Sequence, residues 1–121
     1  MKNSLIFILI ISFLIKCNSP SKGFKEEIIG EWVGDSTKNV YKGQIVNTLP
    51  NLVIILFEKD SVFWGTKGQG YSKFAYSTTG SYLNINGEEI KILELNKERL
   101  VIERVVKKNL SDVSSYNKAN D

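Results

Sequence analysis

The spacing of apolar and polar residues changes twice along this chain of 121 residues. Residues 5–15 form an apolar run that a single serine interrupts. Phe24 and Ile28 then fall at positions i and i+4, which predicts one or two helical turns. After Gly30 the apolar residues recur mainly at every second position, the pattern of strands that bury one face. The pattern therefore predicts a short helical segment followed by a β-rich domain.

Eight short strands are predicted after Gly30, each bounded by turn-forming residues. No amphipathic stretch of about ten residues interrupts them, so a helical core is not expected. Sequential strands joined by short turns favour antiparallel pairing, and hence an all-β sandwich or barrel. The predicted strands are Glu31–Ser36, Val40–Asn47, Leu52–Glu58, Ser61–Thr66, Tyr71–Ser77, Ser81–Ile85, Glu88–Leu95 and Arg99–Val106.

The connections between the strands carry the strongest local signals. Asn86-Gly87 predicts a type I′ hairpin turn, because both central residues of that turn need a positive φ. Further tight turns are predicted at Lys59-Asp60, Thr78–Gly80 and Asn96–Glu98. The alternation slips by one residue between Ile92 and Leu93, which indicates a β-bulge.

The N-terminal apolar run has the length of a secretory signal peptide. Lys2 provides a basic start, and the run is shorter than the roughly 20 residues that a membrane-spanning helix needs. Leu14-Ile15-Lys16-Cys17 resembles the lipobox of bacterial lipoproteins, although Lys16 replaces the usual small residue. In such proteins the cysteine is acylated and becomes the new N-terminus. The alternative is an uncleaved anchor with an incidental cysteine.

These features predict four parts of the chain. Residues 1–16 are the expected signal peptide, and residues 17–23 are the expected lipidated tether, since they are polar and turn-rich. Residues 24–107 are the expected barrel domain. Residues 108–121 form a polar C-terminal tail that we expect to be frayed or weakly helical. A lipid on Cys17 places the protein in a bacterial cell envelope, anchored to a membrane on its periplasmic or surface side.

Charge and residue types argue against several function classes. Without Lys2 and Lys16, 14 basic residues stand against 13 acidic ones, and no basic block suited to nucleic acid is present. The chain has no histidine, and its one cysteine is the expected lipid site, so neither a catalytic centre nor a metal site is expected. The glycine-rich segment Gly65–Gly70 lacks the ending and the following helix of a phosphate-binding loop. We therefore expect no enzyme activity and no cofactor.

Gly30-Glu31-Trp32 opens the first predicted strand directly after a helical turn, as the G-x-W motif does in lipocalins. The segment 80–103 is similar to the closing strands of short lipocalin-like lipoproteins from Gram-negative envelopes. The resemblance implies an antiparallel up-and-down barrel of about eight short strands. It also implies a barrel end closed by Gly30, Trp32 and a cation stacked on the indole, here Arg104. The alternative for Arg104 is a solvent-facing position near a strand end.

A lipocalin-like barrel implies a small hydrophobic ligand. Trp64, Tyr71, Phe74 and Tyr76 are the aromatic residues that we expect nearest such a cavity, and core packing is their alternative role. The ligand is expected to be neutral or weakly amphipathic and to enter at the barrel end opposite Trp32. Strand alternation predicts which turns lie at that end: Thr37-Lys38, Lys59-Asp60, Thr78–Gly80 and Asn96–Glu98.

A second hypothesis is a non-catalytic envelope interaction or assembly module with a solid barrel core. It rests on the segment Leu52–Phe57, which is apolar on both faces and so needs cover on the outside, and on tyrosines at outward-facing strand positions. A connected apolar void on the order of 300 Å³ would favour a ligand, and a filled interior would favour the interaction role. A third hypothesis, an inhibitor or immunity-type lipoprotein, has no sequence feature of its own. The sequence identifies no protein partner.

Overall fold

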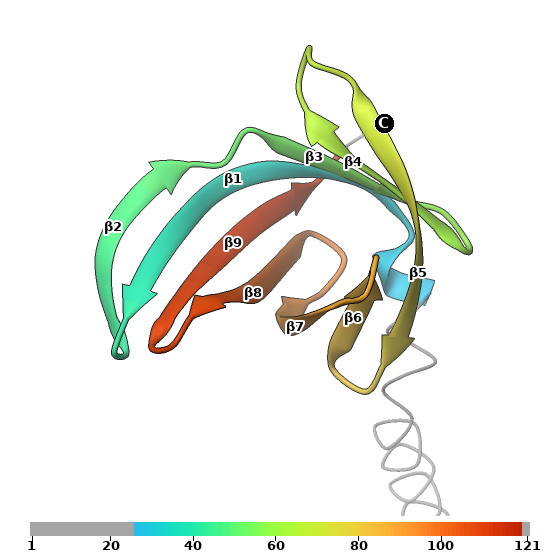
Figure 1. Cartoon of the computed structure of the whole chain (residues 1–121). Helices are drawn as coiled ribbons and strands as arrows, with labels where there is room; N and C mark the ends of the chain where they lie inside the picture. Colours follow the sequence, from blue (N-terminus) through green and yellow to red (C-terminus); the bar gives the residue numbers. More distant parts are fainter. Residues whose placement is uncertain (1–25, 120–121) are drawn as a thin grey trace, which may run out of the picture.

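The computed structural model describes residues 26–119 and shows a closed antiparallel β-barrel (Figure 1). A single helical turn over residues 26–28 precedes the strands. The all-β prediction is confirmed. The predictions for Phe24, Cys17, the tether and the signal peptide concern residues that lie outside the described part of the chain. The strands are β1 (Gly30–Tyr41), β2 (Gln44–Pro50), β3 (Val53–Phe57), β4 (Ser61–Thr66), β5 (Tyr71–Thr79), β6 (Tyr82–Ile85), β7 (Glu88–Leu95), β8 (Arg99–Lys107) and β9 (Leu110–Lys118).

Strand β1 closes the barrel because it pairs with β9 on one side and with β3 on the other. From β3 to β9 each strand pairs antiparallel with the next. Strand β2 is additional to this ring: it pairs with Ser36–Tyr41 of β1, whereas β3 pairs with Gly30–Val33. Strands β2 and β3 therefore run in the same direction along one edge of β1, separated by Asn51 and Leu52. Eight strands form the barrel wall, and β2 extends beyond it.

The strand that completes the barrel is β9, so the prediction of a frayed or weakly helical tail is wrong for Leu110–Lys118. Strand β9 pairs with β1 over nearly its whole length and with β8 on its other edge. Its polar side chains find partners on β1. Thr37 Oγ1 lies 3.0 Å from Ser114 Oγ, and Asn39 Nδ2 donates to Asp112 Oδ1 at 2.5 Å. Cross-strand hydrogen bonds stabilise a strand whose sequence has few apolar residues.

The predicted strand Val40–Asn47 is also wrong, because the chain turns within it. Lys42 and Gly43 have φ angles of 50° and 81°, and they form the tight turn between β1 and β2. Asn86 and Gly87 adopt φ angles of 52° and 80°, which confirms the predicted hairpin turn. The predicted bulge is confirmed by the register shift between Ile92 and Glu94.

The interior is filled over the half of the barrel where β1 begins. Trp32 and Ile28 are fully buried there, and we call this the closed end. Trp32 Nε1 donates to the carbonyl oxygen of Ile28 at 2.7 Å, which connects the helical turn to the indole. The fully buried side chains are Ile28, Trp32, Ile55, Phe57, Val62, Leu83, Leu100, Ile102 and Tyr116. None of the buried side-chain polar atoms in residues 26–119 lacks a hydrogen-bond partner. Residues 26–119 thus contain a complete barrel with its own core.

Three of the four turns expected opposite Trp32 lie instead at the closed end. Gly30 pairs with Phe57, so the β3–β4 turn is beside the start of β1. The amide of Lys118 donates to the carbonyl of Glu98 at 2.8 Å, which places the β7–β8 turn at the same end. By alternation the β5–β6 turn lies there too. The prediction reversed the chain between Val40–Asn47 and Leu52–Glu58, whereas β2 and β3 run in the same direction, so every later strand was predicted in the wrong direction. The fourth expected turn, at Thr37-Lys38, lies within β1.

The opposite end, the open end, carries the β1–β2, β4–β5, β6–β7 and β8–β9 connections. Figure 1 shows β1, β2, β8 and β9 extending away from the rest of the barrel as a curved sheet.

Among residues 26–119, no helix is long and apolar enough to span a membrane.

Candidate ligand site at the open end of the barrel

A cup of about 240 Å³ occupies the open end of the barrel above the filled core. One wall comes from β4 and β5, through Trp64 and Phe74. The facing wall comes from β6, β7 and β8 and from the turn between β6 and β7. Its residues are Ile85, Asn86, Glu88, Ile90 and Arg104.

The cup exists because the barrel wall is incomplete at this end. Strand β5 pairs with β4 through Tyr71–Ala75 and with β6 only from Tyr76 onward. Strand β6 has four residues and ends at the Asn86-Gly87 turn, so it stops before the upper half of β5. Within the described part of the chain, no strand pairs with Tyr71–Ala75 on that side. Figure 1 shows β5 continuing well beyond β6.

Ile85 and Ile90 form the floor of the cup, and Tyr76 lies in the core beneath them. Ile85 and Ile90 are 6% and 2% exposed, so they contact the cup at its base while packing in the core. The Tyr76 ring packs edge-on against Phe57 with 5.1 Å between centroids, and its hydroxyl donates to the carbonyl of Glu58 at 2.5 Å. Burial, followed by the nearby negative charge of Asp60, raises the pKa of Tyr76 above 10.0. Tyr76 therefore belongs to the core and not to the cup lining.

The structure brings together two of the four aromatic residues that were predicted near a cavity. Trp64 and Phe74 line the cup, and Tyr76 lies beneath it. Tyr71 is 53% exposed and lies on the outside of the barrel, in a shallow groove with Ile54, Leu56 and Phe63. These residues give partial cover to the outer face of β3, the strand that was predicted to be apolar on both faces.

A charged pair forms the rim of the cup. Arg104 Nε and Nη2 each donate to one carboxylate oxygen of Glu88, both at 2.8 Å. The hydrogen bond from Arg104 lowers the pKa of Glu88 below 4.5, and the same bond raises the pKa of the guanidinium. Both side chains remain 45% exposed, so the pair faces solvent at the mouth. Its charges cancel, which leaves hydrogen-bonding groups but no net charge.

A polar strip continues from this pair across the inner face of β9 and β1. Arg104 lies opposite Asp112 in the sheet, and Asp112 accepts the hydrogen bond from Asn39. The next pair towards the core is Thr37 with Ser114. This strip was not predicted from the sequence, because β9 was not predicted. The alternation of Asp112, Ser114 and Tyr116 was the signal that could have found it.

The cation at the closed end is Lys118, not Arg104. Lys118 Nζ lies 4.6 Å from the centroid of the Trp32 ring and donates to the carbonyl oxygen of Ile29 at 2.6 Å. Arg104 is at the other end of the barrel, so the predicted stacking of Arg104 on Trp32 is wrong. Gly30 has a φ of 128°, and a β-carbon at this position would collide with the Lys118 side chain. Gly30, Trp32 and Lys118 together close the barrel.

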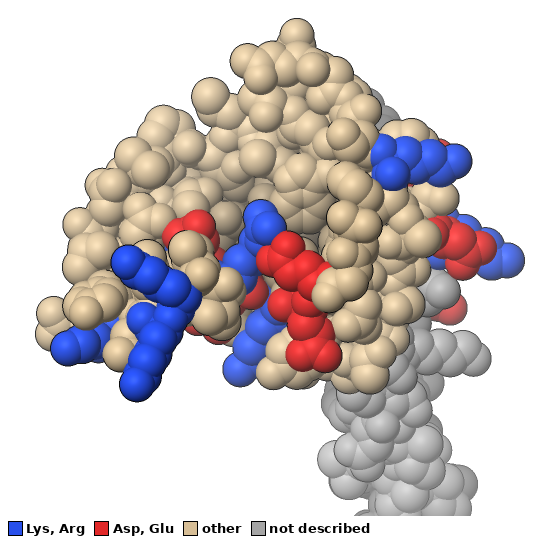
Figure 2. Space-filling model, in the orientation of Figure 1, with Lys and Arg blue, Asp and Glu red and all other residues tan. Residues whose placement is uncertain are grey.

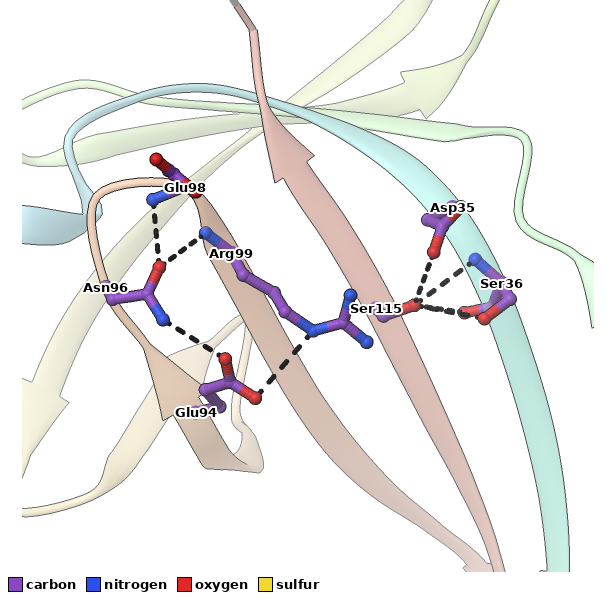
Figure 3. Close-up of polar contacts among 7 residues, drawn as sticks. All are labelled: Asp35, Ser36, Glu94, Asn96, Glu98, Arg99 and Ser115. Atoms are coloured by element: carbon purple, nitrogen blue, oxygen red, sulfur yellow. Dashed lines mark hydrogen bonds and ion pairs between the residues drawn. The ribbon is translucent and has the colours of Figure 1, made fainter.

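Two further polar clusters stabilise the barrel wall near the closed end (Figure 3). The Asn96 side chain accepts hydrogen bonds from the amides of Glu98 and Arg99, both at 2.9 Å, and donates to Glu94. On the neighbouring strands, Ser115 Oγ lies 3.1 Å from Ser36 Oγ. Figure 3 shows the Arg99 side chain extending from β8 towards β9. These contacts shape a turn and a strand pair, and they do not contribute to the cup.

Residues 26–119 contain no group of three or more acidic, histidine or cysteine side chains placed to hold a metal ion.

The cup combines an apolar floor with a neutral hydrogen-bonding rim. This combination suits binding of a small amphipathic molecule. No protein-family model matches the chain, and no curated protein is similar to it in sequence.

Proposed function

We propose that this chain is a lipid-anchored, lipocalin-like binding protein of the bacterial cell envelope that holds a small amphipathic ligand in the cup. The observation that carries the proposal is the pairing of Trp64 and Phe74 with the Arg104–Glu88 rim around one cavity. The role is binding and not catalysis.

The volume of the cup limits the size of the ligand. At about 240 Å³ it is slightly smaller than the 300–1,000 Å³ usual for drug-sized molecules. It fits a single ring or the end of one acyl chain. The mouth is open, so the remainder of a longer molecule would lie outside the barrel.

The rim determines the preferred polar group. Arg104 and Glu88 satisfy one another, so a fully charged ligand would have to compete with a bidentate ion pair. A hydroxyl, amide or ester needs no such exchange, because it can donate to Glu88 or accept from Arg104 while the pair stays intact. Affinity then comes mainly from apolar area buried against Trp64 and Phe74, at about 25 cal/mol per Å².

Tryptophan fluorescence tests the proposal with an internal control. The chain has two tryptophans, of which Trp64 lines the cup and Trp32 is buried at the closed end. Titration with medium-chain alcohols, monoacylglycerols, fatty acids, retinoids and porphyrins should give saturable changes for uncharged amphiphiles. Trp64→Phe should abolish the signal, and Phe74→Ala should weaken binding by about tenfold, or about 1.4 kcal/mol.

Tyr71→Ala is the matched control, since Tyr71 is an exposed aromatic residue of the same strand that lies outside the cup. This variant should leave the affinity unchanged. The proposal fails if no compound in the set gives a saturable change, or if Tyr71→Ala weakens binding as much as Phe74→Ala does.

The second candidate function is an interaction module, and a specific feature of β2 favours it. All seven residues of β2 are exposed, and within residues 26–119 only β1 pairs with it. The strand has no charged residue and its single proline is the terminal Pro50, so Gln44–Leu49 lack the lysine or proline that natural edge strands often carry against pairing. A strand from a partner protein could extend the sheet at this edge. Val46→Lys should abolish such pairing without touching the cup, and cross-linking in cells followed by identification of the partner would test it.

A further inference from the structure

The β1–β2 and β8–β9 turns form one joined projection at the open end. The amide of Lys42 in the first turn donates to the carbonyl of Asn109 in the second at 2.9 Å. Tyr41 and Leu110, at the strand ends, are register partners in the sheet. Lys42 and Asn109 both have positive φ angles, as tight two-residue turns require. We call residues 41–46 and 105–110 the tip.

Lysines and exposed aliphatic residues are combined on the tip. Lys42, Lys107 and Lys108 are exposed, and Figure 2 shows basic side chains projecting at the left, where these turns lie in Figure 1. The sequence has no acidic residue between Asp35 and Glu58 or between Glu103 and Asp112. The exposed apolar side chains of the tip are Tyr41 (43%), Ile45 (58%), Val46 (61%), Val105 (74%) and Val106 (55%).

We propose that the tip docks on an anionic phospholipid surface. Aliphatic side chains beside lysines, without carboxylates, are complementary to a bilayer interface that carries negative headgroups above acyl chains. Nucleic acid is a less suitable partner. Val105, which is 74% exposed beside these lysines, would gain no favourable interaction from contact with phosphates. The inference is independent of the ligand in the cup, since no tip residue lines it.

Docking would also orient the barrel. The tip and the cup lie at the same end, and the helical turn at residues 26–28 lies at the other. A docked tip therefore brings the mouth of the cup towards the lipid surface and leaves the helical turn on the side away from it.

Vesicle co-sedimentation tests the proposal. A chain that starts at Asn18 retains the complete barrel of residues 26–119 and lacks both the leader and the cysteine. It should bind vesicles of phosphatidylcholine mixed with phosphatidylglycerol and should bind pure phosphatidylcholine weakly. High salt should reduce binding, because exposed charges are screened. Replacing Lys42, Lys107 and Lys108 by glutamine should weaken binding by about 100-fold, at about fivefold per lysine.

Matched controls separate the tip from general charge. A triple variant with Lys59→Gln, Lys91→Gln and Lys97→Gln changes the net charge equally at exposed sites outside the tip, and it should bind nearly as well as the unmodified chain. Val105→Ser with Val106→Ser should weaken binding while leaving the charge unchanged. All these sites are exposed, and circular dichroism melts will check that each variant is folded.

Three results would overturn the proposal. The first is equal binding to neutral and anionic vesicles, and the second is an equal loss in the two triple-lysine variants. The third is a concentration-dependent dimer that Val46→Lys dissociates while vesicle binding is absent, since the exposed apolar residues would then belong to an interface between copies of this chain.

Discussion

The ammonium group of Lys118 lies 4.6 Å from the centre of the Trp32 ring, where the last strand of the barrel meets the first. Trp32 comes from β1 and Lys118 from β9, so this contact joins elements that are far apart in the sequence. It covers the indole at the closed end, where Trp32 is fully buried. The contact makes the C-terminal strand part of the barrel closure.

Replacing Lys118 tests this closure. Lys118→Met keeps most of the aliphatic side chain but loses the cation over Trp32 and the hydrogen bond to Ile29. We expect a loss of about 1 kcal/mol in the free energy of unfolding, within the range for exposed to partly desolvated cation–π contacts. Urea denaturation is the measurement, and Lys108→Met is the control because it lies at the other end. If the two variants have the same stability, the contact does not stabilise the barrel.

Gly34→Ala should destabilise the barrel strongly. A β-carbon on Gly34 would lie 2.6 Å from Cγ of Asn51, whose side chain crosses Gly34 to donate from Nδ2 to the carbonyl of Ser115 at 3.2 Å. Neither residue can move easily, because Asn51 is 7% exposed and also accepts a hydrogen bond from the amide of Val53. We expect a loss of about 1–3 kcal/mol, as for overpacked cores.

Asn51→Ala examines the same site from the other side. This variant leaves the buried carbonyl of Ser115 and the amide of Val53 without partners, at a cost of about 1–3 kcal/mol. Asn47→Ala, on exposed β2, is the matched control and should change little. Thermal melts of all three variants provide the comparison. A small effect at both Gly34 and Asn51 would contradict the packing described for this crossing.

The Arg104–Glu88 pair predicts a pH dependence with a definite sign. The pKa of Glu88 is lower in the folded state than its ordinary value of 4.5, chiefly through the hydrogen bond from Arg104. A lowered carboxyl pKa stabilises the fold above the ordinary value, and this contribution is lost as pH falls through the folded pKa. Because both side chains are 45% exposed, the contribution is at most about 1 kcal/mol.

Urea melts at several pH values test that sign. The difference in unfolding free energy between the unmodified protein and Arg104→Gln should be constant near neutral pH and should shrink below 4.5. In a Glu88→Gln background the same Arg104 substitution should give a difference that no longer shrinks over this range. A difference that grows as the pH falls would contradict the assignment.

Acylation at Cys17 is predicted from the leader. Cys17 is the only cysteine and directly follows a signal-length apolar run. Metabolic labelling with a clickable fatty acid should mark the unmodified chain and not Cys17→Ala, and mass spectrometry should find the mature protein without residues 1–16. Equal labelling of both chains would show that the lipid is attached elsewhere or that the label is nonspecific.

The sequence by itself determined those features that depend on local geometry and on the period of the pattern. Asn86-Gly87 specifies its hairpin turn because few other residue pairs adopt two successive positive φ angles easily. The break in the alternation at Leu93 specifies a bulge. Without an extra residue at that point, the apolar residues that follow would face the solvent side of the strand. The apolar alternation was sufficient to predict the all-β class, because a period of two residues is that of a strand with one buried face.

Only the tertiary structure decided which strand closes the barrel, which cation meets Trp32 and which end is open. Strand β9 is polar, and its stability comes from pairing with β1 and β8, so the alternation of Asp112, Ser114 and Tyr116 alone does not show where it pairs. The Lys42-Gly43 turn lacks the usual asparagine, so the end of β1 was misplaced. Strands β2 and β3 both pair antiparallel with β1 and run in the same direction, whereas the prediction reversed the chain between them. Because successive antiparallel strands alternate in direction, that single error exchanged the two ends of the barrel. It placed Arg104 at Trp32, where the structure has Lys118.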